Sequence, residues 1–468
     1  MNNPRRRLVA LPDPRELKDL FGSVNTVRGF AERITLLLSN ATRFDLSGTP
    51  LQETALFRGL SRYFEGSNES QLVPFVQSTL HAAADFLDEY AAFGRNQMFP
   101  LEAPHWECSR LRCRGILANS LLGNIAGDPV ARLKEHSGPG QGLCFLPMYL
   151  STSYAAAHKV QCILQYMDAS AQMGVHESNE MISFDRVSMA ASDFQHLDAW
   201  QQELRDSTMV QAITTNVMEN GEAHAMVNFA NKVFGVGRFA SSCTQEEILQ
   251  VCCPEINVGM LVHGEMGASA AVVVRNARRY SSYAGYGRSF QFVGPYQPPL
   301  EQTIIFMDAS ITASREHQFS KENNLRDIRK AYLGFLASAA SSTDLSHPSF
   351  LTHPRSARRG PHVVSTGKWG CGAFGGDPVL KFLQQIVAAF MCGGDSQRMV
   401  AVIFSSYRDK KLKQILLEVL ENTKGWTPQD LLRQVLTKQG LFDSGDGYAK
   451  LIKRLEQKQT KQSIFCLF

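Results

Sequence analysis

The strongest constraint on the fold is an alternation of two kinds of apolar segment between residues 190 and 437. Short runs rich in β-branched and aromatic residues, such as "MVNFA", "AAVVV", "TIIFMDA" and "VAVIFSS", are bounded by turn residues and are typical of buried strands. Longer segments between them, such as "QEEILQVC", "RDIRKAYLGFLASAA" and "PVLKFLQQIVAAFMC", have helical spacing. This alternation favours an α/β fold, in which helices cover a sheet.

The first 190 residues have a different pattern. Helical spacing of apolar residues extends through "LVPFVQSTLHAAADFLDEYAAF", "RGILANSLLGNI" and "AAHKVQCILQYMDASAQM". We therefore predict an N-terminal extension at 1–70, a mainly helical accessory region at 71–190, the α/β domain at 191–437 and a charged C-terminal tail at 438–468.

Composition excludes several classes of protein. Of the 468 residues, 44% are apolar and 20% are charged, which is ordinary for a globular chain and unlike a disordered one. A formal net charge of +4 permits an anionic partner but does not favour a protein that coats a nucleic-acid duplex. The ten cysteines have no repeated C-x-x-C pattern, so we expect free thiols and no metal site. We also expect no membrane span and no secretion signal, because the apolar runs are too short.

The segment "TQEEILQVC" allows two interpretations. Thr244 and Glu247 have the spacing of a capping box, in which a hydroxyl and a carboxylate satisfy backbone N–H groups at a helix start. The pair Glu246 and Glu247 also resembles a catalytic site with two carboxylates. Gln245 and Glu246 are not needed for the cap, so both interpretations stay open.

Two glycine-rich stretches and one aromatic stretch are further candidates. "GVGRFA" fits a loose dinucleotide fingerprint, but no strand ending in an acid follows at the required distance. "STGKWGCGAFGGD" precedes the helix predicted to begin at Asp377–Pro378, and such loops can bind anions through backbone N–H groups. "RRYSSYAGYGRSFQF" interleaves aromatic and basic residues, which suits stacking on a base and equally suits packing in a strand.

Taken together, these segments resemble the poly(ADP-ribose) glycohydrolase family. "VNFANKVFGVG", then seven residues, then Gln245-Glu246-Glu247 is similar to the family's V-D-F-A-N-[KR]-x-x-G-G-G…Q-E-E. "YSSYAGYG", "IRKAYLGF" and "TGKWGCGAFGGD" also resemble family motifs, and the resemblance covers about residues 70–437. It implies a macrodomain-like mixed sheet flanked by helices, and hydrolysis of ribose–ribose O-glycosidic bonds in poly(ADP-ribose).

The resemblance also implies roles for polar residues, carried over by position. Glu247 would protonate the leaving 2′-oxygen and then help to activate water, mainly once substrate is bound. Glu246 would position the ribose hydroxyls, with Asn231 beside it, and Gln245 would contact the nucleotide.

Further positions would enclose or hold the ligand. Tyr286 and Phe374 would enclose the adenine, and Phe335 would press against the catalytic ribose. The diphosphate would be held by backbone groups of the two glycine loops, at Gly235, Gly237, Gly372, Ala373 and Phe374.

The chain departs from the family pattern at several positions. Asn228 stands where the family has Asp, which removes a charge behind the site. Val236 replaces the middle glycine, and a β-branched residue adopts positive φ poorly. Met218 stands where the family tends to have Glu, and Arg329 replaces an Asn. These changes keep open an alternative function: an impaired or non-hydrolysing ADP-ribose-binding module.

A basic insertion, "HPSFLTHPRSARRGPHVV" at 347–364, precedes the second glycine loop and stands where the family has only a few residues. We interpret it either as a solvated loop or as a grip on the polyanionic chain beyond the scissile unit. The expected partners are poly(ADP-ribose) and ADP-ribosylated proteins, without direct DNA binding or membrane contact. We expect no cofactor, a monomer, and a nuclear or cytoplasmic location.

Overall fold

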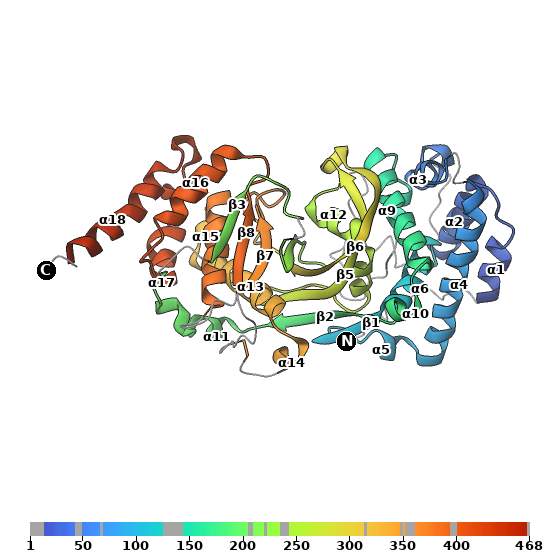
Figure 1. Cartoon of the computed structure of the whole chain (residues 1–468), viewed down its shortest axis with the longest axis horizontal. Coiled ribbons are helices and arrows are strands. Elements are labelled where there is room, and N and C mark those ends of the chain that lie inside the picture. Colours follow the sequence, from blue (N-terminus) through green and yellow to red (C-terminus); the bar gives the residue numbers. More distant parts are fainter. Residues whose placement is uncertain are drawn as a thin grey trace, which may run out of the picture. The chain divides into compact units, whose positions relative to one another are not determined.

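The computed structural model describes residues 14–42, 49–65, 69–124, 143, 145–204, 209–219, 222–234, 243–312, 316–346, 350–351, 361–393 and 400–465. The chain divides into two compact units (Figure 1). Unit 1 consists of Met1–Phe184, Val233–Glu265 and Val274–Gln302, and unit 2 of Asp185–Lys232, Met266–Val273 and Thr303–Phe468. The domain boundaries proposed from the sequence are a different division of the chain and stay predictions.

Unit 1 contains most of the N-terminal helices. Its helices and helical turns are α1 Pro14–Phe21, α2 Val27–Thr42, η1 Leu51–Glu53, α3 Ala55–Tyr63, α4 Glu69–Phe93, α5 Arg95–Met98, α6 Arg110–Leu121, α8 Leu146–Tyr149, α9 Tyr154–Ala171, α10 Val175–Ser178, α12 Gln245–Cys252, η4 Pro254–Leu261 and η5 Gly287–Ser289.

Two glycines allow close packing among these helices. A Cβ on Gly59 of α3 would lie 2.6 Å from the Val160 side chain of α9, and a Cβ on Gly115 of α6 would lie 2.6 Å from Phe86 of α4. These separations are too short for any side chain, so α3 meets α9, and α6 meets α4, at backbone distance. The apolar faces predicted from helical spacing are buried in these contacts.

A buried ion-pair network also ties unit 1 together. Arg110, at the start of α6, is 1% exposed and donates to Glu255 Oε2 at 2.7 Å and to the carbonyl of Asn276 at 2.6 Å. Glu255 also accepts hydrogen bonds from the Tyr280 hydroxyl at 2.6 Å and from the Arg278 backbone N–H at 2.8 Å. Because these residues come from distant parts of the chain, the network joins its segments.

Among the described residues, eight strands form one sheet in the order β1-β2-β5-β6-β4-β7-β8-β3. The strands are β1 His105–Ser109, β2 Met181–Ser188, β3 Val210–Thr214, β4 Ala225–Phe229, β5 Ala270–Ala284, β6 Gln291–Met307, β7 His362–Gly367 and β8 Val400–Ser405. β4 pairs in parallel with β6 and β7, and β8 pairs in parallel with β7 and β3. The loops that follow these parallel strands therefore leave from one edge of the sheet.

Unit 2 surrounds the parallel strands with helices. These are α11 Ala191–Gln195, η3 Asp198–Gln201, η6 His317–Phe319, α13 Lys321–Ala339, α14 Ser342–Leu345, α15 Pro378–Met391, α16 Lys410–Glu421, α17 Pro428–Leu431, the π-helical turn η7 Leu432–Leu436, η8 Gln439–Leu441, η9 Ser444–Asp446 and α18 Ala449–Phe465.

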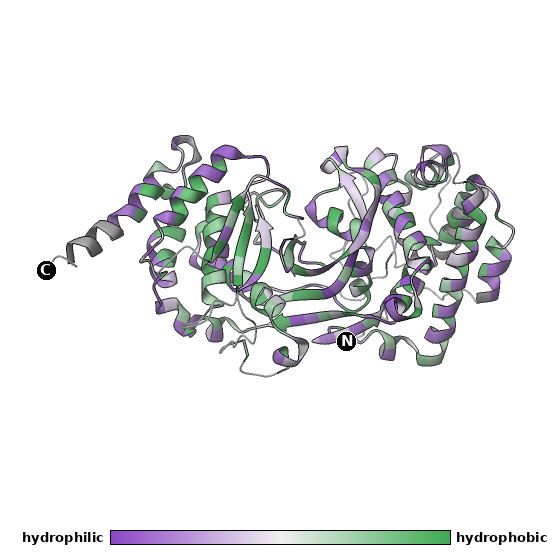
Figure 2. Ribbon diagram, in the orientation of Figure 1, coloured by the Kyte–Doolittle hydropathy of each residue, from purple (hydrophilic) through white to green (hydrophobic). Residues whose placement is uncertain are grey.

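The core of unit 2 lies between its strands and two long helices. β8 is buried along its whole length, and its apolar residues are green in Figure 2. A Cβ on Gly334 of α13 would lie 2.5 Å from the Ile305 side chain of β6, so this helix rests directly on the sheet. α15 packs against α13 and β8, which completes a helix layer on the sheet.

The α/β fold class expected from the sequence is confirmed, and so are the strands predicted in "MVNFA", "AAVVV", "TIIFMDA" and "VAVIFSS". Two strands, β1 and β2, interrupt the region that helical spacing suggested to be mainly helical. The charged segment 438–468 contains α18, whose Leu451 and Leu455 are completely buried. In the described part of the chain, every helix is too short or too polar to cross a bilayer.

Candidate active site

The acid pair lies at the start of α12, where Gln245, Glu246 and Glu247 form the first helical turn. All three are buried, with Glu247 only 1% exposed. Acidic side chains in a first helical turn interact favourably with the positive end of the helix dipole. Burial of polar groups without such compensation would be costly, so the helix start makes this arrangement possible.

Glu247 takes part in the predicted cap. Its Oε2 accepts hydrogen bonds from both the backbone N–H and the hydroxyl of Thr244, the N-cap residue. The structural interpretation of "TQEE" is therefore correct for Glu247. It does not compete with a chemical role, because a carboxylate fixed through one oxygen presents the other in a defined direction.

A buried lysine stands behind this helix start. Lys159 of α9 is 3% exposed, and α9 packs against α12. Burial lowers the pKa of Lys159, while the nearby Cys243 and Glu247 oppose that shift. Burial likewise raises the pKa of the Cys243 thiol well above its ordinary value, and the Lys159 ammonium counteracts this only in part. Lys159 thus supplies a buried positive charge close to Glu247.

Tyr286, the predicted adenine contact, is 45% exposed at the tip of the β5–β6 hairpin. The Gly287 backbone N–H donates to the carbonyl of Cys243 at 2.7 Å. Cys243 immediately precedes the N-cap of α12, so this hydrogen bond joins the hairpin tip to the start of the acid helix. Gly285 has φ +76°, and a Cβ there would lie 1.9 Å from the Ser289 carbonyl oxygen, which requires glycine.

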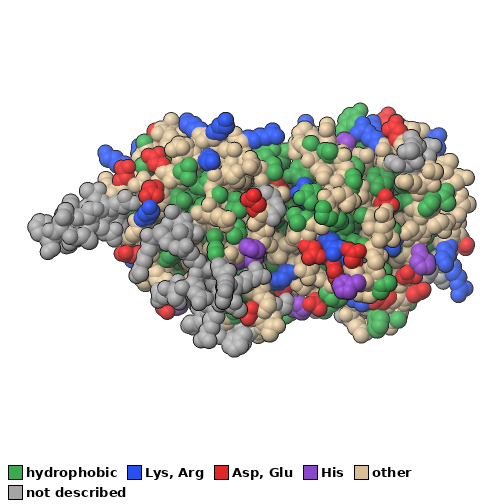
Figure 3. Space-filling model, viewed as in Figure 1, with side chains coloured by type: hydrophobic (Ala, Val, Ile, Leu, Met, Phe, Trp, Pro, Cys, Tyr) green, Lys and Arg blue, Asp and Glu red, His purple; other side chains and the backbone are tan. Residues whose placement is uncertain are grey.

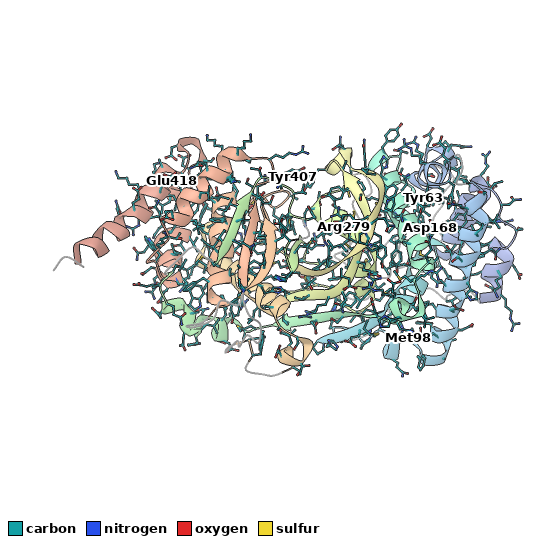
Figure 4. The ribbon with its side chains drawn as sticks, viewed as in Figure 1. Tyr63, Met98, Asp168, Arg279, Tyr407 and Glu418 are labelled. Carbon is teal, nitrogen blue, oxygen red and sulfur yellow. The ribbon has the colours of Figure 1, made fainter. Side chains whose placement is uncertain are left out.

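Stacked aromatic and cationic groups stiffen the same hairpin. The Arg279 guanidinium carbon lies 4.5 Å from the ring centroid of Tyr296 and 5.4 Å from that of Tyr283. Tyr283 stacks on Phe290 at 5.8 Å between ring centroids. Figure 4 labels Arg279 on β5. These contacts brace the strands of the hairpin that carries Tyr286.

The second glycine loop lies in unit 2, between β7 and α15. Gly372 and Ala373 are exposed and Phe374 is half-buried. The Thr312 N–H donates to the carbonyl of Phe374 at 3.2 Å, which fixes the outer part of the loop. The loop ends at the N-cap Asp377, whose carboxylate accepts hydrogen bonds from the first turn of α15 as its Asp-Pro sequence predicted.

The inner part of this loop is shaped by Lys381 of α15. Gly370 has φ +73°, and a Cβ there would lie 2.5 Å from Ala309 Cβ and 3.3 Å from Lys381 Cε. A Cβ on Gly376 would lie 2.9 Å from both Lys381 Cε and the Gly370 carbonyl oxygen. The Lys381 ammonium lies 5.0 Å from the centroid of the Trp369 ring. Two of the glycines are therefore required by contacts beneath the loop, whatever ligand the loop holds.

A cluster of buried charges continues below the loop. Lys381 pairs with Asp327, Arg326 pairs with Asp327 at 2.7 Å and with Asp308, and Lys330 pairs with Asp308. Burial opposes ionisation of Asp327, yet Lys381 and Arg326 hold its pKa below the ordinary value. Burial lowers the pKa of Lys330 to about 8, although Asp308 opposes the shift. With every group charged, three cations face two carboxylates, and the cluster favours an anion above it.

The remaining predicted residues of unit 2 lie on or after β4. Asn228 is completely buried, and neither its side-chain oxygen nor its nitrogen has a hydrogen-bond partner among the described residues. Asn231 follows the strand and is half-buried. Because β4 and β7 are parallel neighbours, Asn231 and the second glycine loop leave from the same edge of the sheet. The first glycine loop, with Gly235, Val236 and Gly237, and most of the basic insertion, with Arg355, Arg358 and Arg359, lie outside the described residues.

The expected contact of Phe335 with the catalytic ribose stays a prediction. Phe335 lies within α13, and its side chain is completely buried. In this arrangement the Phe335 ring packs within the core of unit 2. The sequence motif identified the residue type, but the helical face decides its exposure.

The sequence motifs did not identify the buried charged residues around the candidate site. Lys159, Lys381, Asp308 and Asp327 all carry charges within or beside apolar runs, as in "PVLKFLQQIV" and "TIIFMDA". A single charged residue in an otherwise buried segment is the signal that could have identified them, since such a charge needs a partner.

Comparison with known proteins is consistent with this geometry. Residues 197–414 match the family model described as poly(ADP-ribose) glycohydrolase, macro domain fold. Poly(ADP-ribose) glycohydrolase 1 of Arabidopsis thaliana is 28% identical over 306 residues, which cover 52% of this chain and 54% of that protein. Poly(ADP-ribose) glycohydrolase 1 of Caenorhabditis elegans is 26% identical over 308 residues, covering 61% of this chain and 36% of that protein. The chain thus aligns with about half or less of the length of these curated relatives.

Proposed function

We propose that this chain, whose residues 197–414 belong to the macro-domain-fold region of the poly(ADP-ribose) glycohydrolase family, hydrolyses ribose–ribose O-glycosidic bonds in poly(ADP-ribose) and releases ADP-ribose. The observation that carries the proposal is the buried acid pair at the start of α12, with Glu247 anchored through one oxygen.

Glycoside hydrolysis breaks a C–O bond through an oxocarbenium-like state, and it needs a proton for the departing oxygen. The free oxygen of the Glu247 carboxyl group supplies that proton to the leaving 2′-oxygen. The resulting carboxylate then accepts a proton from the water that adds to the anomeric carbon, which restores the acid. The Thr244 hydrogen bonds keep the carboxyl group oriented through both steps.

The other residues bind and orient substrate. Glu246 holds the ribose hydroxyls, with Asn231 as a further polar contact, and Gln245 contacts the nucleotide. Tyr286 supplies an exposed ring for the adenine, and the exposed turn at Gly372–Phe374 supplies backbone N–H groups for the diphosphate.

Replacement of the acid tests the proposal. Glu247→Gln should reduce release of ADP-ribose from polymer by roughly 10²–10⁴-fold, the usual contribution of a general acid. It should leave calorimetric binding of ADP-ribose within a few-fold of wild type, because the amide keeps the shape. Glu65→Gln, an exposed change outside the proposed site, is the matched control and should leave both measurements unchanged.

The alternative function has its own signature. A wild-type chain that binds ADP-ribose but releases none from polymer would be a non-hydrolysing binding module. Val236 is the sequence feature that favours it, because a side chain stands where the family has glycine. Under the alternative, Val236→Gly should tighten ADP-ribose binding.

The proposal extends to partners and location. The partners are poly(ADP-ribose) and ADP-ribosylated proteins, without direct DNA binding, and the chain acts as a monomer in the nucleus or the cytoplasm. The basic insertion at 347–364, whose last three residues begin the buried strand β7, grips the polymer beyond the scissile unit through its arginines. Replacing Arg355, Arg358 and Arg359 together should therefore weaken binding of long polymer but not of ADP-ribose.

A further inference from the structure

A second basic surface lies within the described part of unit 2, where β7 and β8 end. These strands are parallel neighbours, and Gly367 at the end of β7 pairs with Ser405 at the end of β8. The cationic residues that follow the two strands gather at this edge, and we call them the basic rim: Lys368, Arg408, Lys410, Lys411 and Lys413. Figure 3 shows Lys and Arg side chains along the edge of the molecule that α16 occupies in Figure 1.

Tyr407 holds part of the rim in place. Its ring centroid lies 5.8 Å from the Lys368 ammonium and 5.5 Å from the Arg408 guanidinium carbon, and Figure 4 labels this tyrosine beyond β8. Tyr407 and Arg408 both adopt positive φ, at 44° and 60°, which is uncommon for two consecutive residues with side chains. The Arg408 N–H donates to the carbonyl of Thr215 at 2.9 Å, so the turn is fixed by the strands around it.

The charges along α16 are arranged unfavourably with respect to the helix dipole. Lys410 and Lys411 occupy the first turn, where the helix dipole disfavours cations, while Glu418 and Glu421 lie in the last part, where it disfavours anions. The one acid of the rim segment, Asp409, is used as the N-cap and accepts a hydrogen bond from the Leu412 N–H at 2.8 Å. Helix stability therefore does not explain the placement of these lysines.

The rim also lacks internal neutralisation. None of its five cations forms an ion pair with a described residue, whereas Lys424 at the far end of the same helix region pairs with Glu421. Five cations and the single carboxylate of Asp409 give the segment a formal charge of +4, as large as the net charge of the whole chain. A concentrated charge of this size attracts a polyanion more strongly than a single phosphate, because each further phosphate meets a further cation.

We propose that the basic rim is a docking surface for the poly(ADP-ribose) chain outside the unit being cleaved, with Lys368 joining it to the second glycine loop. The inference rests on the proposed function for its choice of polyanion. Lys368 is part of both the rim and the loop, so a polymer whose diphosphate meets the loop can continue along α16. A nucleic-acid strand would meet the same cations, and the test separates it from the polymer.

The test replaces the three exposed rim cations, as Arg408→Gln/Lys410→Gln/Lys411→Gln. Binding of fluorescent poly(ADP-ribose) of about 20 units and of ADP-ribose is measured at several salt concentrations. Loss of three contacts to a single strand should flatten the plot of log affinity against log salt by about 2, from 0.7 per contact. Polymer affinity at low salt should fall about tenfold or more, while ADP-ribose affinity should change less than twofold.

The matched control, Arg433→Gln/Lys438→Gln/Lys453→Gln, removes three exposed cations from other parts of unit 2 and should keep the wild-type slope. An unchanged polymer slope in the rim variant, or equal slopes in both variants, would overturn the proposal. So would a rim variant that loses binding of single-stranded RNA but not of poly(ADP-ribose). A chain that binds polymer through the rim yet releases no ADP-ribose would refute the proposed hydrolysis and leave the rim supported, so the two failures are distinguishable.

Discussion

Separate substitutions of Gly370 and Gly372 in the second glycine loop distinguish a glycine required for packing from one that could contact a ligand. Gly370→Ala places a Cβ at φ +73°, 2.5 Å from Ala309 Cβ. A left-handed conformation costs a residue with a side chain about 1–2 kcal/mol, and overpacking adds about 1–3 kcal/mol. The free energy of unfolding should therefore fall by about 2–5 kcal/mol. Gly372→Ala is the matched control, since its Cβ would have no neighbour within 4 Å.

Thermal unfolding and calorimetry with ADP-ribose measure the two effects. For a cooperative unit of about 200 residues, the loss at Gly370 should lower Tm by about 5–15 °C. Gly372→Ala should keep the wild-type Tm, and any loss of ADP-ribose affinity in that variant would report a ligand that approaches the exposed backbone. A Gly370→Ala protein as stable as wild type, or a Gly372→Ala protein equally destabilised, would refute the reasoning from packing.

Three further predictions concern two buried charges and the tip of the β5–β6 hairpin. Arg110→Met should lower the free energy of unfolding, measured by urea titration, by about 3–5 kcal/mol, because it leaves the buried Glu255 carboxylate without its cationic partner. A decrease of less than about 1 kcal/mol would contradict this. Gly285→Ala should weaken ADP-ribose binding, since its Cβ would overlap the Ser289 carbonyl and displace the hairpin tip, and an unchanged Kd would count against a role for that tip. The pKa of Lys330 is about 8 in the folded protein, so between pH 8 and about 10.5 the unfolded chain binds a proton that the folded chain has lost. The free energy of unfolding should therefore rise with pH across this window. Lys330→Met should remove the rise.

Local signals explain which parts of the fold the sequence revealed. α12 and α15 begin where the capping sequences at Thr244 and Asp377 predicted, because a cap depends on residues within one turn. β1 and β2 were not predicted because they lie among segments with helical spacing. Strand order and register depend on pairings between distant segments, which no local pattern encodes.

The sequence predicted the residues that would contact a ligand better than the buried charges that lie around them. The resemblance singled out Glu246, Glu247 and the second glycine loop, and the structure gives each of them a defined place in its unit. The resemblance could not reveal the ion pair between Lys381 and Asp327, because it forms only where α15 packs against α13. It also could not reveal that Phe335 faces the core, since only the orientation of α13 on the sheet decides that.

The Arg110 network has a consequence for dissection of the chain. A fragment that stops at residue 184 keeps the Arg110 guanidinium but omits the Glu255 carboxylate and the Asn276 carbonyl, which accept its hydrogen bonds from far downstream. Residues 1–184 are therefore not expected to fold as an independent domain in another protein. During synthesis on the ribosome, unit 1 can be completed only after its later segments have been made. Truncations at this point should yield aggregating or protease-sensitive material, whereas nicks that leave both parts together should be tolerated.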